Sequence, residues 1–394
     1  MKILIAPDKF KGALSAREVA DSIAAGLREV LPDAKIDITP MADGGEGTAE
    51  VISQGLGGSW VKCKAHDPLG REIEARYGWI ESHPPSPRLW RDGRKLAVME
   101  MSEAAGIRRL QPNEYDVDLA NTFGVGEMIF EAARRRAEQI IIGLGGSATN
   151  DGGFGMARAL GFRFFAGTKE LNGPIHELEQ LTRVVAPSPA ASRLPLPEGE
   201  DEGEGKAVTK IVAAVDVRNP LLGENGATRV FGPQKGATPD QIKILERALA
   251  KLAEVVAEQF GFDYRNKPGA GAAGGLGFGL MIFCGATIRP GFDVVAESIG
   301  LEAKMKDVDL VITGEGSLDR QTLEGKTPAG VARLARKLGK RVFAMVGRAA
   351  KDRRARELFD GVYQNARAGM SQEENMKRAG ELLRENAREL ARGL

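Results

Sequence analysis

The stretch from residue 309 to residue 337 limits the fold most strongly, because a strand, a glycine-rich loop and an amphipathic helix follow one another in it. Residues 310–312 are Leu-Val-Ile, a short run typical of a strand buried on both faces of a parallel sheet. Thr327 as N-cap and Pro328 at the first helical position predict a helix start. Apolar side chains then recur at helical spacing, at Val331, Leu334, Ala335 and Leu338. Such a unit predicts an α/β fold.

The loop between this strand and helix, residues 314–325, combines glycines with charged side chains. Its charged residues, with the lysine that follows it, are Glu315, Asp319, Arg320, Glu324 and Lys326. In open α/β sheets, ligands bind at the carboxyl ends of strands and the amino ends of helices. The loop is therefore predicted to form half of an active site. A solvated surface connection is the alternative, and the recurrence of acid-plus-glycine loops after other strand-like runs argues against it.

The same rhythm of strand and helix occupies both ends of the chain. Parallel strands are predicted at residues 3–6, 35–39, 309–313, 341–346 and 361–363. Helix starts are predicted by Ser15 with Glu18, by Thr48, and by Ser371 with Glu374, the last helix running to the C-terminus. These elements predict a flavodoxin-like, doubly wound parallel sheet domain formed by residues 1–60 and 291–394.

The middle of the chain has a different pattern. Residues 60–64 and 72–80 predict antiparallel strands joined by a turn, and residues 95–101, 139–144 and 210–215 predict further strands. Thr122 and Thr238-Pro239 begin helices. At 394 residues the chain is too long for one ordinary core. We therefore expect residues 61–290 to form a second, inserted α/β domain, with the active site in the interdomain cleft.

Composition excludes several classes of function. Lys plus Arg number 55 against 54 for Asp plus Glu, and no basic stripe stands out, which argues against nucleic acid or an anionic membrane as partner. Two cysteines are too few for a disulfide framework or a cysteine zinc site. The histidines lie outside every motif discussed here. The N-terminus is too short and too soon charged for a signal peptide, and no apolar run would span a bilayer, so a cytoplasmic protein is expected.

Three features together favour phosphoryl transfer. Glycine-rich loops at helix starts present backbone N–H groups to phosphate. Lysines in these loops, at Lys11, Lys235 and Lys326, would neutralise charge on a transferred group. Acids that end strands or follow them, at Asp43, Asp216 and Asp319, would act as general base or as magnesium ligands. For each lysine taken alone, a solvated surface charge is an equally good interpretation.

No single motif is specific. Glu324-Gly-Lys-Thr327 imitates the tail of a P-loop, but Arg320 stands where its first glycine belongs. Residues 143–148, Gly-Leu-Gly-Gly-Ser-Ala, are similar to the phosphate loop of galactokinase-type kinases. Asp151 before Gly152 favours a helix N-cap, and close packing of a helix against a sheet is the alternative for the glycines of residues 271–279.

Taken together, the loops resemble the glycerate kinase family in its first type, that of the bacterial glyoxylate and galactarate pathways. The segments that carry the resemblance are residues 6–12, 40–48, 143–153, 216–221, 232–237, 269–275 and 313–322. They occur in the family's order and cover nearly the whole chain. The resemblance implies ATP- and Mg²⁺-dependent phosphorylation of D-glycerate, usually at the 2-hydroxyl. It also implies the two-domain arrangement.

Motifs and resemblance give a set of candidate residues. Asp319 or Asp216 is expected to accept the hydroxyl proton, Lys11 to help hold the substrate carboxylate, and Lys326 or Lys235 to stabilise the transferred phosphoryl group. Substrate or phosphate contacts are expected at Asp8, Lys9, Gly145, Gly146, Ser147, Thr149, Asn150, Asp151, Gln234, Lys235, Gly314, Gly316, Ser317, Arg320 and Lys326. Metal contacts are expected at Asp43, Glu46 and Glu315.

Two residues depart from the family's pattern, and other functions stay open. Lys9 replaces a usual Ser, and Arg218 stands where the family tends to have an acid. A kinase for another hydroxy or sugar acid, or one that forms 3-phosphoglycerate, is one alternative. A two-domain protein that binds an organic acid without chemistry is another. A monomer or homodimer is expected.

Overall fold

The structure is a computed structural model that describes residues 1–81, 95–187, 209–318, 326–350 and 356–394. A five-stranded sheet joins both ends of the chain, in the order β14-β13-β12-β1-β2, with all neighbours parallel. Its strands are β1 (Lys2–Ile5), β2 (Lys35–Ile38), β12 (Leu310–Leu318), β13 (Arg341–Ala349) and β14 (Gly361–Gln364). Counted along the chain, this is the flavodoxin-like order 2-1-3-4-5. The predicted flavodoxin-like sheet is confirmed.

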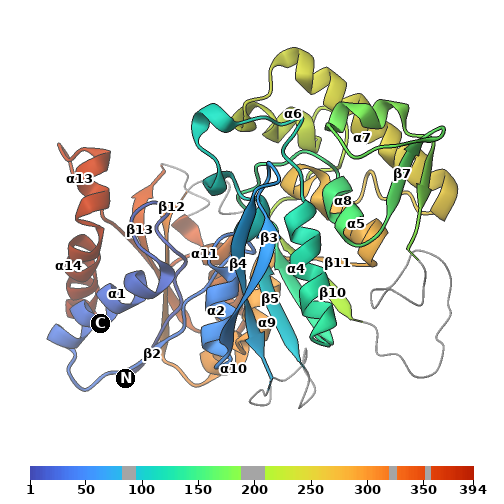
Figure 1. The fold of residues 1–394 in the computed structure, drawn as a ribbon. Helices are drawn as coiled ribbons and strands as arrows, with labels where there is room; N and C mark the ends of the chain where they lie inside the picture. Colours follow the sequence, from blue (N-terminus) through green and yellow to red (C-terminus); the bar gives the residue numbers. More distant parts are fainter. Residues whose placement is uncertain (82–94, 188–208, 319–325, 351–355) are drawn as a thin grey trace.

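Helices cover both faces of this sheet (Figure 1). On one face, α1 (Ala16–Val30) packs against α14 (Ala379–Arg392), so helices from the two ends of the chain lie side by side. The predicted capping box starts α1, because Ser15 accepts from the Glu18 N–H and the Glu18 carboxylate accepts from the Ser15 N–H. The ion pairs of Glu29 with Arg384 and Arg388 add a polar rim to this contact.

A six-stranded sheet is built from the middle of the chain, in the order β11-β10-β6-β5-β4-β3. Its strands are β3 (Ser59–His66), β4 (Glu72–Ile80), β5 (Leu96–Glu100), β6 (Gln139–Gly143), β10 (Lys210–Val215) and β11 (Thr287–Pro290). The pairs β3–β4 and β4–β5 are antiparallel and the rest are parallel, which confirms the predicted antiparallel pair.

Helices and a small sheet complete this part of the molecule. The small sheet has the order β8-β7-β9, formed by β7 (Arg163–Ala166), β8 (Lys169–Glu170) and β9 (Arg183–Val185). The helices are α3 (Ser102–Ala105), α4 (Phe123–Arg134), α5 (Phe154–Ala159), α6 (Ala227–Phe231), α7 (Pro239–Phe260) and α8 (Ala272–Cys284). Short 3₁₀ helices occur at η1 (Ile107–Arg109), η2 (Pro112–Glu114), η3 (Ile175–Gln180) and η4 (Pro233–Lys235).

One apolar layer lies between the two large sheets. Helices α2 (Thr48–Gly55) and α9 (Gly291–Ser298) contact each other there, and α10 (Leu301–Lys306) and α11 (Thr327–Lys337) belong to the same layer. Its buried cluster includes Leu4 and Val311 of the first sheet and Val98 and Ile141 of the second. The fold is thus an α/β architecture built on two large sheets. The exact domain division at residues 60 and 290 stays a prediction, although β3 and β11 lie at those boundaries.

Several element boundaries differ from the sequence-based expectation. Strand β12 continues to Leu318 rather than ending at Thr313, because β13 pairs with it as far as Leu318 opposite Ala349. Helix α11 has Lys326 rather than Thr327 as N-cap, and α2 has Gly47 as N-cap with Thr48 as its first residue. The last helix is broken at Arg378 into α13 (Gln372–Lys377) and α14.

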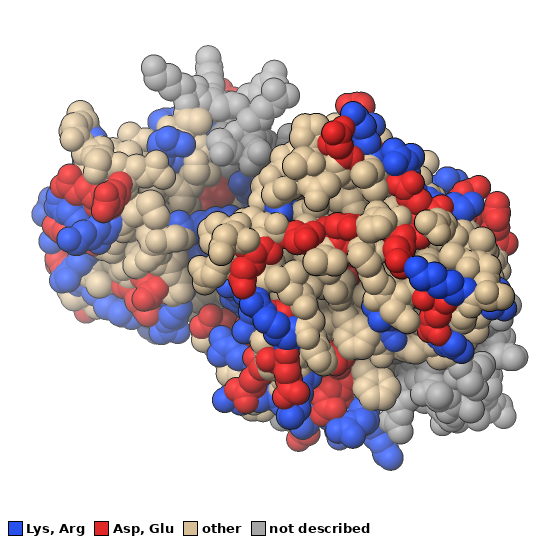
Figure 2. Space-filling model, turned by 45° about the horizontal axis from the view of Figure 1, so that its top comes forward, with Lys and Arg blue, Asp and Glu red and all other residues tan. Residues whose placement is uncertain are grey.

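The molecular surface carries both signs of charge. On the face shown in Figure 2, acidic and basic side chains are interspersed over both lobes, and the surface is hollowed between them. Within the described ranges, none of the helices combines the length and the apolar character needed to cross a membrane.

Candidate active site

Glycine backbones let loops of the two large sheets meet at the ends of their strands. A Cβ atom on Gly143, at the end of β6, would lie 2.7 Å from the Gly44 carbonyl oxygen. One on Gly145 would lie 2.6 Å from the Gly45 Cα atom. Real side chains do not approach backbone this closely, so only glycine permits the contact. The loop after β2 is therefore fitted directly against the loop after β6.

Three carboxylates gather near this junction, from three different loops. Burial and the neighbouring Asp43 charge raise the pKa of Asp8 to about 7. Loss of hydration and Asp43 likewise raise the pKa of Asp216 to about 6. Asp216 stays accessible to solvent, but the protein around it removes much of its hydration. The Asp43 charge thus affects the pKa of both Asp8 and Asp216, which is the behaviour expected of carboxylates that share one site.

Two lysines offset this concentration of negative charge. Lys9 lowers the pKa of both Asp8 and Asp216, and Lys326 lowers that of Asp216. The Lys9 ammonium group also donates to the backbone carbonyl of Glu46. Lys9 therefore brings a cation into the cluster.

Asp8 joins the beginning of the chain to the loop region around β12 and α11. Its backbone N–H donates to the Gly314 carbonyl oxygen at 2.8 Å. Its carboxylate accepts from the Thr327 hydroxyl group at 2.7 Å. Thr327 therefore binds an acid of the candidate site instead of capping its own helix.

A buried lysine holds the glycine-rich loop after β6 through hydrogen bonds. Lys235 is 2% exposed, and its Nζ atom donates to Ser147 Oγ at 2.8 Å and to the Thr149 carbonyl oxygen at 2.6 Å. Burial lowers the pKa of Lys235 to about 7. Asn150 is buried as well, and its Nδ2 donates to Thr228 Oγ1. Lys235 is thus placed to shape the loop.

The N-cap of α5 is Gly153 rather than the expected Asp151, but the Asp151 carboxylate still binds backbone N–H groups at the start of this helix. This carboxylate accepts from the backbone N–H groups of Thr122, Gly153 and Gly155 and from the Thr122 hydroxyl group. These contacts fix the start of α5 against the start of α4.

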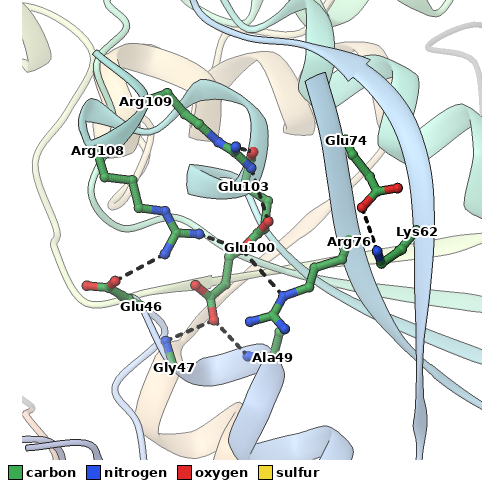
Figure 3. A network of polar contacts seen from close by, with 10 residues as sticks. All are labelled: Glu46, Gly47, Ala49, Lys62, Glu74, Arg76, Glu100, Glu103, Arg108 and Arg109. Atoms are coloured by element: carbon green, nitrogen blue, oxygen red, sulfur yellow. Dashed lines mark hydrogen bonds and ion pairs between the residues drawn. The ribbon is translucent and has the colours of Figure 1, made fainter. Parts of the chain in front are cut away.

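A cavity of about 360 Å³ opens beside the carboxylate cluster. Asp8, Lys9 and Lys11 line it from the loop after β1. Its opposite side is formed by α2 and by the edge of the second sheet. Glu100 lies there, and its Oε1 accepts from the Gly47 and Ala49 N–H groups at the start of α2 (Figure 3).

Several charged residues of this cavity lie outside the motifs that the sequence offered. Arg108 pairs with Glu46 Oε1 at 3.1 Å and with Glu103 Oε1 at 2.5 Å (Figure 3). Arg76 lies over the Trp60 ring, 4.4 Å from its centroid. Glu100 ends the buried strand β5 and Glu103 lies just after it, and acids at such a place are a sequence signal for a site. Arg108 has no comparable signal in the sequence.

The remaining predicted residues are divided between accessible and buried positions. Gly146, Gln234 and Lys11 are exposed, whereas Glu315 is buried in β12. Gly314, Gly316 and Ser317 belong to the same strand rather than to a loop. Asp319 and Arg320 lie outside the described residues.

The donor set suits a magnesium ion held partly by ligands other than protein. In the described parts of the chain, no group of three His, Cys, Asp or Glu side chains is arranged to hold a metal. Mg²⁺ usually keeps several waters and uses one or two carboxylates together with substrate phosphates. Asp43, whose charge adds to burial in raising the pKa of Asp8 and of Asp216, fits such a site. Glu46 instead pairs with Arg108.

Comparison with known proteins identifies relatives over nearly the whole chain. The glycerate kinase family model matches residues 3–394. A glycerate kinase of Halalkalibacterium halodurans is 39% identical over 395 residues, which cover 99% of this chain and 97% of that protein. A glycerate 2-kinase of Escherichia coli is 40% identical over 353 residues, covering 89% and 86%.

A solved structure shows the same fold. The crystal structure of a protein designated glycerate kinase 2, from Salmonella typhimurium LT2, superposes with a TM-score of 0.80 at 39% identity. The match covers 100% of this chain and 98% of that one. Since the family model and these relatives extend over nearly all of the sequence, the chain belongs to the glycerate kinase family, and it is a kinase.

Proposed function

We propose that the protein transfers the γ-phosphoryl group of ATP to D-glycerate, at the 2-hydroxyl group, with Mg²⁺ as cofactor. The observation that carries the proposal is the cluster of three carboxylates and two lysines, namely Asp8, Asp43, Asp216, Lys9 and Lys326. Two of these residues, Asp8 and Lys9, line the cavity. The family and the E. coli relative's name, glycerate 2-kinase, support the substrate and the hydroxyl group.

The proton of the attacking hydroxyl group would pass to a carboxylate. Asp216, whose pKa is about 6, is largely ionised at neutral pH and is accessible, as a general base must be. Asp319 stays the second candidate from the sequence. Asp8 is better suited to fixing the site, because its carboxylate is already held by Thr327.

The phosphates of ATP would lie against backbone N–H groups and lysines. Bound Mg²⁺ would neutralise charge on the phosphates, with Asp43 as the leading protein ligand and Glu315 as a further candidate. Lys326, at the start of α11 and close enough to act on Asp216, is the lysine best placed to stabilise the transferred group. Lys235 would act indirectly, by holding Ser147 and Thr149 in place.

The test is an assay of ADP release with D-glycerate, ATP and Mg²⁺, with the product identified by phosphorus NMR. A glycerate-dependent 2-phosphoglycerate signal supports the proposal, and a 3-phosphoglycerate signal contradicts the assigned hydroxyl group. Absence of turnover with D-glycerate, alongside turnover with another hydroxy acid from a matched panel, contradicts the substrate. Asp216→Asn tests the base, since near-normal turnover of that variant would reject the assignment.

A further inference from the structure

Arg108 occupies a position in the cavity that would suit the recognition of a carboxylate. It lies on η1, just after α3, and its guanidinium group bridges two acids. The Nη1 atom donates to Glu46 Oε1 at 3.1 Å, and the Nη2 atom donates to Glu103 Oε1 at 2.5 Å (Figure 3). The planar guanidinium group matches carboxylates better than any other side chain does.

The two acids that hold Arg108 are not equivalent. The Glu103 side chain is 15% exposed and also pairs with Arg109 Nη2 at 3.3 Å, so it is a fixed anchor. The Glu46 side chain is 53% exposed, and exposed ion pairs contribute only about 0–1 kcal/mol. A ligand carboxylate could therefore replace Glu46 at little cost while Glu103 keeps the guanidinium group in place.

The neighbours of Arg108 connect this position to the carboxylate cluster. Lys9 donates to the backbone carbonyl of Glu46, the residue whose side chain Arg108 holds. Burial raises the pKa of Glu100, and the charges of Arg108 and Lys9 both oppose that rise; Lys9 also acts on Asp8 and Asp216. A small hydroxy acid bound through its carboxylate at Arg108 would thus share the cavity with Lys9, whose charge acts on the candidate base Asp216.

We propose that Arg108 binds the carboxylate of the hydroxy-acid substrate and that the Glu46 side chain occupies this position when substrate is absent, as an internal competitor. The proposal rests on the proposed function and adds to it the residue that selects an acid over a neutral alcohol. Its rival is a purely structural ion pair between the loop after β2 and η1. The two hypotheses predict opposite effects of the Glu46 side chain on substrate binding. A competitor weakens binding, whereas a structural partner supports it.

The experiment compares steady-state kinetics of the full chain and its variants with D-glycerate, D-glyceramide and ATP. For Arg108→Gln we expect the KM for D-glycerate to rise about 10- to 100-fold, the loss typical of a hydrogen bond to a charged group. The KM for ATP should stay within about twofold. The preference for D-glycerate over the neutral amide should fall by a similar factor, and Arg108→Lys should restore part of it.

Two further variants separate the proposal from its rival. Glu46→Gln should lower the KM for D-glycerate by up to about fivefold, because the competing carboxylate is removed. Arg135→Gln is the control, since Arg135 forms a comparable ion pair with Glu131 at the end of α4 and is not among the described residues that line the cavity. It should change neither KM by more than about twofold.

The outcomes distinguish the inference from the function on which it rests. An unchanged KM for D-glycerate in Arg108→Gln, an equal or larger rise in the KM for ATP, or a higher KM for D-glycerate in Glu46→Gln would each overturn the inference. If the wild-type protein does not phosphorylate D-glycerate, the proposed function fails. Calorimetric titration of D-glycerate into wild type and Glu46→Gln then still tests the site, and equal or weaker binding by the variant rejects it.

Discussion

The Thr327 hydroxyl group donates a 2.7 Å hydrogen bond to the Asp8 carboxylate, although the two residues are 319 positions apart in the sequence. Both side chains are buried. The bond favours the ionised form of Asp8, in opposition to burial and the Asp43 charge, which together raise its pKa to about 7. A link between the loop after β1 and the start of α11 thus contributes to the charge of the candidate site.

Replacement of Thr327 should move the pH dependence of the reaction. Thr327→Val removes the donor, so the pKa of Asp8 should rise further and the low-pH limb of kcat/KM should shift to higher pH. Ionised Asp8 offsets the positive charge of Lys9, and its protonation alters the charge of the site. The measurement is kcat/KM for D-glycerate from pH 5 to 9. Thr327→Ser keeps a hydroxyl group and should retain the wild-type profile; a Val profile that coincides with it would contradict the prediction.

Asp8 should lower the stability of the folded protein at neutral and higher pH. Its pKa of about 7 in the folded state exceeds the ordinary value of 3.8, so the folded state binds more protons between about pH 4 and 7. Stability from this group is therefore present at low pH and is lost as the pH rises through about 7. Asp8→Asn should gain stability relative to wild type across this window, by a few kcal/mol at most.

Urea unfolding of both proteins at pH 5, 6, 7 and 8 measures this difference. The surface acid Asp21, which pairs with Arg17 on α1, provides the control Asp21→Asn. We expect no comparable change with pH for that variant. A free-energy difference between Asp8→Asn and wild type that stays constant from pH 5 to 8 would show that Asp8 titrates normally.

Local signals in the sequence predicted the elements, whereas contacts between distant loops could not be predicted from it. The capping box of Ser15 and Glu18 depends on residues three apart, so it can be read from the sequence alone. The extension of β12 to Leu318 depends on pairing with β13, and glycine in the sequence suggested a loop there. Arg108 reaches Glu46 only because η1 and the loop after β2 pack together. The site's loops were therefore predictable, but its pairings were not.

Lys235 should make stability rise with pH in the alkaline range. Its pKa is lowered to about 7 in the folded state, against 10.5 ordinarily, so the unfolded state binds more protons between these values. The free energy of unfolding of wild type should therefore increase relative to Lys235→Met from about pH 7 to 10. Urea unfolding at pH 7, 8, 9 and 10 measures it. Lys169→Met, at an exposed pair with Glu177, is the control, and parallel curves for Lys235→Met and wild type would refute the prediction.

Gly145 should be required for activity because of the contact it permits, since a Cβ atom there would lie 2.6 Å from the Gly45 Cα atom. Backbone cannot yield as a flexible side chain does, so Gly145→Ala must push the loop after β6 away from the loop after β2. We expect kcat/KM for D-glycerate to fall about 10- to 100-fold, because small misplacements in a site are costly. The free energy of unfolding should fall by about 1–3 kcal/mol.

Gly393→Ala is the matched control for this substitution. Its Cβ atom would meet the Leu390 carbonyl oxygen at 3.5 Å, an ordinary contact, at the end of α14. Activity and stability of that variant should remain close to wild type. If Gly145→Ala behaved like Gly393→Ala in both measurements, the loops after β2 and β6 could move apart without loss of activity or stability. The close fit of their backbones would then have no part in positioning the carboxylates and the glycine-rich loop for phosphoryl transfer.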